Sequence, residues 1–142
     1  MKPPNRNEQG SVSAEAVIVV PVFLLLVGVL VLGGRIAIAQ QVVQSAASDA
    51  ARAASIARTA QAAQTDATTA AKHALANQHL DCATTSVSVD VTAFATTVGT
   101  PGQVHATVTC QLKLGDIGLP GVGGTKTVTA TMSSPLDTYR ER

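Results

Sequence analysis

The chain has 142 residues, of which 46% are hydrophobic, 2% aromatic and 13% charged, and its formal net charge is +1. A chain of this length forms one domain, or one domain with a tail. The near-neutral charge argues against electrostatic capture of nucleic acid, and the scarcity of aromatic side chains argues against stacking on bases. We therefore expect no nucleic-acid partner.

An uncharged apolar run at residues 16–34 is the first feature along the chain. As a helix it would span about 28 Å, close to the bilayer hydrocarbon thickness of about 30 Å. It is apolar all round, whereas a helix on a soluble core shows one apolar face. We expect residues 11–39 to cross the cell membrane once. A short N-terminal leader favours a cytoplasmic N-terminus, which predicts an extracytoplasmic C-terminal part.

Two alternatives remain open for this run. It is either a plain signal anchor or a secretory signal, because residues 37–39 read Ala-Ile-Ala and fit a signal-peptidase site. Cleavage after Ala39 would release a small secreted protein that begins at Gln40. Without any cleavage, the chain would be a membrane-anchored extracytoplasmic binding module.

Glu15 lies at the start of the apolar run, although a charged side chain well inside a bilayer costs about 3 kcal/mol or more. Gly10, four residues, Glu15 and an apolar helix together resemble a type IV prepilin processing site. The resemblance implies that residues 1–10 (MKPPNRNEQG) are a cytoplasmic leader, which a prepilin peptidase removes after Gly10 to leave Ser11 as the N-terminus.

The new α-amine would give Glu15 a partner. Glu15 lies one helical turn beyond Ser11, and in a filament it could meet the amine of a neighbouring subunit. Opposite charges attract strongly in a low-dielectric bundle, and an unpaired Glu15 would be costly, so the pair would also set the stagger. The alternative interpretation is that Glu15 only marks the membrane interface.

The stretch SAEAVIVVPVFLLLVGVLVLGGR resembles the N-terminal segment of the TadE-like family, which is found with tight-adherence (Flp-type) pilus systems. The resemblance covers roughly residues 10–55 and is carried by Glu15, Pro21, the apolar residues 23–32, Arg35 and the Ala-Arg-rich residues 50–52. It departs from the family at Ala16, where such pilins often have an aromatic residue. It also departs at residues 33–34, both glycine, where many relatives have a second acid.

The resemblance implies a minor pilin or pseudopilin, a structural component of a Flp/Tad-type pilus or a related secretion assembly. Its partners would be the membrane, a prepilin peptidase and other pilin or Tad secretion-system subunits. Pro21 removes one helical hydrogen bond. It would either bend or locally melt the helix to help packing in a filament, or form an ordinary kink of a membrane helix.

Residues 40–80 form an alanine-rich stem. Alanine is the strongest helix former, and neither proline nor glycine interrupts residues 40–79. The composition predicts a helix continuous with the membrane helix to about Ala76. The stem is either a spacer or sheet-packing surface, or it forms helix bundles through its small residues.

Residues 81–142 are predicted to form a β-rich head with a polar C-terminal tail. Apolar and polar residues alternate at 87–92, 103–114 and 127–132, which predicts three half-buried strands. Residues 100–102 (Thr-Pro-Gly) fit a turn between the first two strands. Three strands need cover on their apolar face, and the stem helix is the candidate. We therefore expect an α+β fold: a transmembrane helix continues into a long alanine-rich helix, on which a small three-stranded antiparallel sheet packs, as in pilins.

Cys82 and Cys110 are the only cysteines. Outside the cytoplasm such a pair is expected to form a disulfide, which the chain-entropy model values at about 3–4 kcal/mol. The alternative is two buried free thiols. His73, His79 and His105 lack metal-ligand spacing, and no catalytic constellation stands out. We expect no enzyme activity, metal, cofactor or small-molecule substrate.

Overall fold

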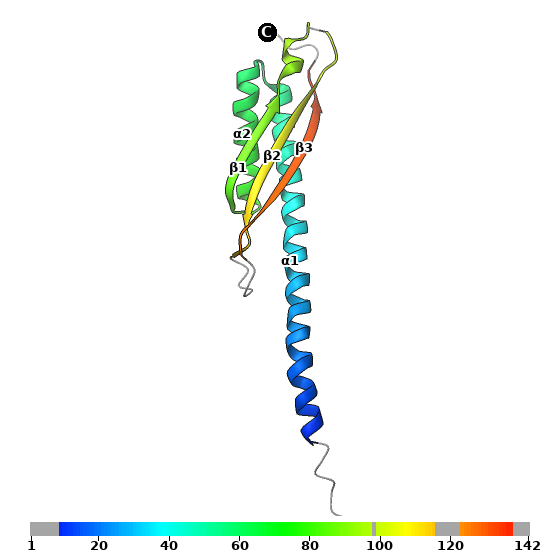
Figure 1. The fold of residues 1–142 in the computed structure, drawn as a ribbon. Coiled ribbons are helices and arrows are strands. Elements are labelled where there is room, and N and C mark those ends of the chain that lie inside the picture. The colour runs from blue at the N-terminus through cyan, green and yellow to red at the C-terminus, as the bar shows by residue number, and fades with distance from the viewer. Residues whose placement is uncertain (1–8, 98, 116–122, 138–142) are drawn as a thin grey trace, which may run out of the picture. The chain divides into compact units, whose positions relative to one another are not determined.

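A computed structural model describes residues 9–97, 99–115 and 123–137, with side chains from Glu15 onward. Most of the predicted leader and part of the polar tail lie outside these residues. The chain forms two compact units, Met1–Arg35 and Ile36–Arg142, which we call the N-terminal and the C-terminal unit. The elements in chain order are α1 (Gln9–Ile56), α2 (Ala60–Asn77), β1 (Cys82–Asp90), the 3₁₀ helix η1 (Thr92–Ala95), β2 (Gln103–Lys113) and β3 (Thr125–Pro135) (Figure 1).

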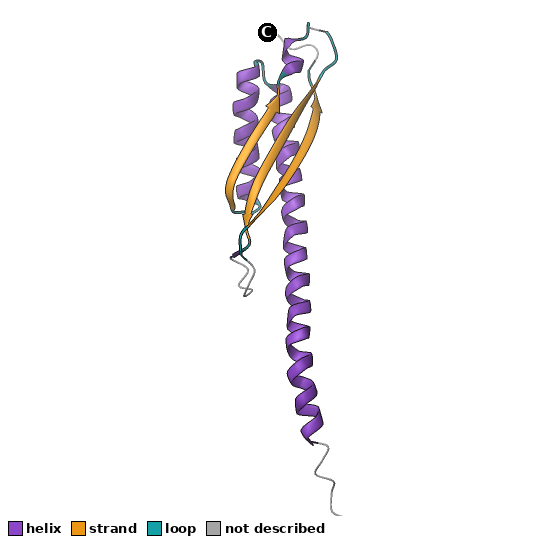
Figure 2. Cartoon of the chain, in the orientation of Figure 1, coloured by secondary structure: helices purple, strands orange, loops and turns teal. Residues whose placement is uncertain are grey.

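The predicted α+β fold is confirmed (Figure 2). A long apolar N-terminal helix and a second helix accompany one antiparallel sheet with the strand order β1-β2-β3. The alternation of valine with serine and threonine produces these strands, because β-branched side chains suit a pleated surface with one buried face.

The stem is two helices, so the prediction of one helix to Ala76 is wrong. α1 ends at Ile56, and Thr59 has an extended backbone with φ −131° and ψ 154°. The Thr59 Oγ1 accepts a hydrogen bond from the Ala62 N–H at 3.1 Å, which caps the N-terminus of α2. This cap offsets the loss of helical hydrogen bonds in a sequence that otherwise favours helix. α2 then runs back beside the last turns of α1 (Figure 1).

α2 ends at Asn77, and Cys82 is the first residue of β1. His79 adopts a left-handed conformation with φ 53°. The Leu80 N–H donates to the Leu75 carbonyl at 3.1 Å, and the His79 N–H donates to the Ala76 carbonyl at 3.0 Å. This pair of bonds is the Schellman pattern that terminates helices.

The connection between β1 and β2 is longer than the predicted turn, because β1 ends at Asp90 and η1 follows. Asp90 Oδ1 accepts from the Thr92 N–H at 3.0 Å and from the Thr92 hydroxyl at 2.7 Å. The bond from the Thr92 backbone N–H and, after it, the bond from the Thr92 hydroxyl hold the pKa of Asp90 below its ordinary value. A carboxylate of this kind stabilises the fold above its unfolded-state pKa, and that contribution is lost as the pH falls through the lowered value.

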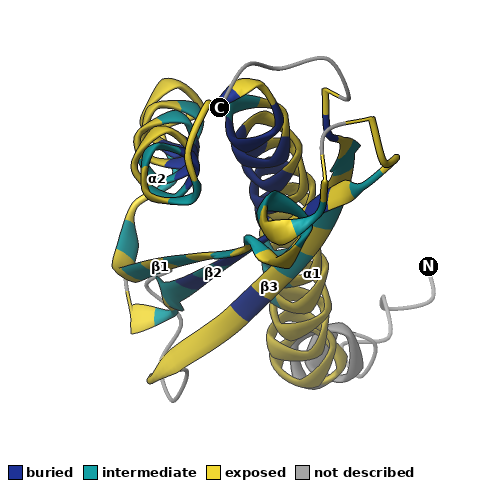
Figure 3. Cartoon of the chain, turned by 90° about the horizontal axis from the view of Figure 1, so that it is seen from above, coloured by how far each residue is buried: buried dark blue, intermediate teal, exposed yellow. Residues whose placement is uncertain are grey.

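Both helices of the C-terminal unit lie on one side of the sheet, and the buried residues of helices and sheet face each other (Figure 3). Most of the helix residues in this core are alanines, which let the layers approach closely but bury little area each. The stem thus packs against the sheet. Ile56, at the end of α1, is 75% exposed and lies outside this core. The core residues are Val42, Val43, Ala46, Ala47, Ala50, Ala51, Ala54, Ala57, Ala63, Ala67, Ala71, Leu75, Val104, Ala106, Val108, Cys110, Val128 and Leu136.

The free edge of β1 is paired with a side chain of α2. Gln64 Nε2 donates to the Val87 carbonyl at 3.0 Å, and the Val89 N–H donates to Gln64 Oε1 at 3.1 Å. The side-chain amide thus makes the two bonds that a neighbouring strand would make. Because an unsatisfied backbone group is costly once it is shielded from water, Gln64 fixes α2 to this edge.

Replacing Gln64 with alanine tests this contact. We expect the free energy of unfolding to fall by about 1–3 kcal/mol, because the Val87 carbonyl and the Val89 N–H lose their partner. Urea denaturation of the full chain in detergent micelles measures the change. Gln61→Ala is the matched control, because Gln61 is an exposed residue of the same helix. Equal stabilities of the two variants would refute the role of Gln64.

Candidate functional site

The N-terminal unit presents an uncharged helical surface. Every large apolar side chain between Val17 and Val31 is exposed, from 39% at Val27 to 73% at Val17. Within the described residues one helix, Glu15–Ile56, is long and apolar enough to cross a membrane. Its most apolar 18-residue window has a mean hydropathy of 3.1, and none of that window is buried. An apolar surface of this extent requires lipid or a protein partner. This is consistent with a single-pass membrane protein.

Glu15 is the exposed acid at the beginning of this surface. Gly10 and Ser11 lie in the first turns of α1, and their side chains fall outside the described part. Since an α-helix has 3.6 residues per turn, Glu15 lies about one turn beyond Ser11. The helix therefore has the spacing that the expected contact between neighbouring subunits needs.

Pro21 lies inside α1, which continues on both sides of it. The helix of the single chain is thus not interrupted at this position. A bend that serves packing in a filament stays a prediction.

The structure brings Cys82 and Cys110 together in a disulfide, with the two Cα atoms 5.4 Å apart. In the sheet register Cys82 is opposite Leu112, and Thr85 is opposite Cys110. An irregularity between Cys82 and Thr84 shifts the start of β1 against β2. Cys110 is fully buried on the inner face of β2, so the bond ties the first residue of the sheet to its centre.

Removing this bond by replacing both cysteines with serine tests its contribution. The bond closes a loop with a sequence separation of 28 residues. We expect the free energy of unfolding to fall by about 3–4 kcal/mol, because the unfolded chain regains the entropy of that loop. Denaturation of the full chain with and without the bond measures the change. Alkylation of both thiols in native protein from the cell envelope, without prior reduction, would contradict the disulfide.

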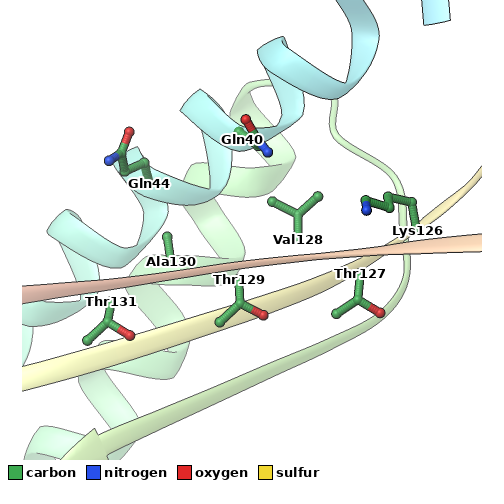
Figure 4. Close-up of a pocket in the computed structure, with 8 residues that line it drawn as sticks. All are labelled: Gln40, Gln44, Lys126, Thr127, Val128, Thr129, Ala130 and Thr131. Atoms are coloured by element: carbon green, nitrogen blue, oxygen red, sulfur yellow. The ribbon is translucent and has the colours of Figure 1, made fainter. Parts of the chain in front are cut away.

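An open cleft of about 450 Å³ lies beside β3 in the C-terminal unit, and the sequence interpretation missed it (Figure 4). The alternation along β3 was visible in the sequence, but the position of β3 at the sheet edge was not. A second cleft of about 520 Å³ lies beside Asp90 and His105. Within the described ranges, no group of three or more histidine, cysteine or acidic residues is placed to hold a metal ion. The cleft beside β3 is lined by Gln40, Gln44, Lys126, Thr127, Val128, Thr129, Ala130 and Thr131.

Comparison with known protein families identifies the N-terminal part of the chain. Residues 10–52 match the family model described as TadE-like protein, which confirms the resemblance stated from the sequence. The matched range includes Gly10, Glu15, Pro21 and Arg35 and covers less than half of the chain. Neither the curated proteins nor the solved structures gave a significant match.

Proposed function

We propose that this chain, whose residues 10–52 are TadE-like, is a minor pilin or pseudopilin of a Flp/Tad-type pilus or a related secretion assembly. Its role is structural and not enzymatic. A prepilin peptidase cleaves it after Gly10 on the cytoplasmic side, and the C-terminal unit lies outside the cytoplasm. The main support for the proposal is the family match, which starts at Gly10 and includes Glu15 at the beginning of the apolar surface.

Two structural features support this orientation and role. The disulfide favours an oxidising compartment for the C-terminal unit. The exposed apolar surface of α1 supports lateral contacts with other membrane helices, since it offers no buried side to a core of its own.

The chemistry of assembly follows from the charge of Glu15. Cleavage after Gly10 creates the Ser11 α-amine, and the carboxylate one turn further on pairs with the amine of a neighbouring subunit. In a low-dielectric bundle an unpaired carboxylate costs several kcal/mol, so only registers that pair the two groups are stable. The leader blocks this pair until the peptidase removes it.

Glu15→Gln tests the proposal, because the amide keeps the size of the side chain and loses its charge. We expect at least about a tenfold decrease of this chain in the sheared pilus or assembly fraction, since a buried ion pair that loses one partner costs about 3–5 kcal/mol. Quantitative immunoblotting of that fraction against total membranes measures the decrease.

Asp49→Asn is the matched control, because Asp49 is an exposed acid of the same helix in the C-terminal unit. It should assemble at the normal level. If Glu15→Gln is incorporated as efficiently as Asp49→Asn, the charge of Glu15 has no part in assembly and the proposal fails.

A further inference from the structure

β3 is an edge strand, and among the residues that the structure describes no strand pairs with its outer side. In an antiparallel sheet the N–H and C=O groups of successive residues point alternately toward one neighbour and the other. The Val87 carbonyl and the Val89 N–H bind Gln64, so these odd-numbered residues of β1 point away from β2. Val87 is opposite Val108, so the backbone groups of Val108 point toward β3. Val108 is in turn opposite Ala130, so the backbone groups of Ala130 bond to β2.

The odd-numbered residues of β3 therefore direct their backbone groups away from the sheet. These are Thr127, Thr129 and Thr131, and no hydrogen bond to their backbone groups is present on the outer side within the described residues. Two backbone bonds just beyond the strand ends, from Leu114 to Gly124 and from Leu136 to Gly102, continue the same register. The outward N–H and C=O groups of these three alternate residues form a template for another strand.

The two edges of the sheet differ. On β1 the side chain of Gln64 takes the place of a neighbouring strand. On β3 no side chain of the described part of the chain makes comparable bonds, although Gln40 and Gln44 of α1 lie across the cleft (Figure 4). Sheet proteins usually protect long edges, so the unpaired edge of β3 is a candidate binding site for another strand.

The side chains of β3 alternate between the side that faces α1 and the opposite side. Lys126, Val128 and Ala130 point toward α1, whereas Thr127 and Thr129 point to the other side (Figure 4). A strand paired with β3 would place every second side chain in the cleft of about 450 Å³ between β3 and α1. Ala130 and Met132 are only half-buried, so such side chains would complete the core on this side.

Charge indicates the chemistry of the occupant. Lys126 lies at one end of the cleft, is exposed and makes no ion pair in the part of the chain that the structure describes. Gln40 and Gln44 carry no charge. A segment with a carboxylate opposite Lys126 is therefore complementary to the cleft, whereas a basic segment would meet like charge.

A symmetric pair of two copies is the first alternative occupant of this edge. Pairing β3 with its own copy around a two-fold axis makes the strands antiparallel. Residues 36–56 of α1 run in the same general direction as β3 (Figure 1), so those helices would also be antiparallel. The two chains would then enter their C-terminal units at opposite ends, whereas the proposed function anchors both copies in one membrane. This step rests on the membrane anchoring of the proposed function, and a second copy is an outcome of the test below.

We propose that the free edge of β3 binds an extended, acid-bearing segment of a different polypeptide of the same assembly as a fourth strand. Backbone hydrogen bonds to Thr127, Thr129 and Thr131 hold the segment, and alternate side chains fill the cleft beside Gln40 and Gln44. Lys126 sets the register through its carboxylate partner. This mode of recognition is β-strand addition.

Hydrogen exchange of single amides tests this proposal. The full chain is measured in purified form in detergent and in native membranes that contain the assembled system. We expect the amides of Thr127, Thr129 and Thr131 to exchange at least about tenfold more slowly in the assembly, because a strand bond must open first. The amides of Val128 and Ala130 should be slow in both states, since they bond to β2.

Two results would overturn the proposal. Equal exchange of the three threonine amides in both states would show that nothing pairs with the edge. Protection in the purified chain that rises with its own concentration would show a second copy as the occupant. Failure of the proposed function is distinguishable, because it would leave the chain uncleaved at Gly10 whatever the state of these amides.

Substitutions at the edge provide a second measurement. Thr129→Pro removes the outward N–H and should abolish protection of Thr127 and Thr131 in membranes, whereas Thr129→Ala keeps the N–H and the protection. Lys126→Glu should reduce the protection, whereas Lys113→Glu, an exposed lysine at the end of β2, should not. The Cys82–Cys110 disulfide reports correct folding of each variant. Unchanged protection in both Thr129→Pro and Lys126→Glu would refute strand addition.

Discussion

The charge of Glu15 is the constraint on which the rest of the account depends. This carboxylate stands where an uncharged helical surface begins, and lipid offers a single chain no counter-charge there. The sequence has a glycine, Gly10, five residues before it, so that the proposed cleavage would create an amine one turn away. In the proposed assembly a neighbouring subunit would supply that amine as the partner of Glu15. The proposal thus links the long apolar surface to the acid at its start.

The C-terminal unit shows how a chain with few large apolar side chains holds a small sheet. Alanine faces on α1 and α2 allow close packing, but they contribute little buried area. Directional contacts supply specificity instead: the disulfide at the start of β1, the amide of Gln64 on its edge, and Ser55, whose hydroxyl accepts from the Ser134 hydroxyl at 3.1 Å. The disulfide and the Gln64 contact lie at β1, whereas the Ser55–Ser134 contact joins α1 to β3.

The strands and the disulfide were predictable, and the helix break was not. Period-two alternation around Val108 and the even spacing of threonines mark the strands because only one face is buried. The break depends on Thr59, whose hydroxyl competes locally with the helix, and helix propensity summed over an alanine-rich window hides one such cap. Gln64 reaches Val87, which is 23 residues away, and the edge position of β3 depends on the strand order. Both are tertiary facts that no local pattern contains. The candidate assembly residues Gly10 and Glu15 were found through the family resemblance.

The N-terminus of the chain extracted from native membranes tests the central claim most directly. Intact-mass and N-terminal peptide mass spectrometry identify it without any variant. The account predicts that the chain begins at Ser11, with residues 1–10 removed. A chain that retains Met1 and the leader would have no amine to pair with Glu15, and one that begins at Gln40 would have lost the apolar segment. Either result would contradict the pilin-type assembly proposed for this protein.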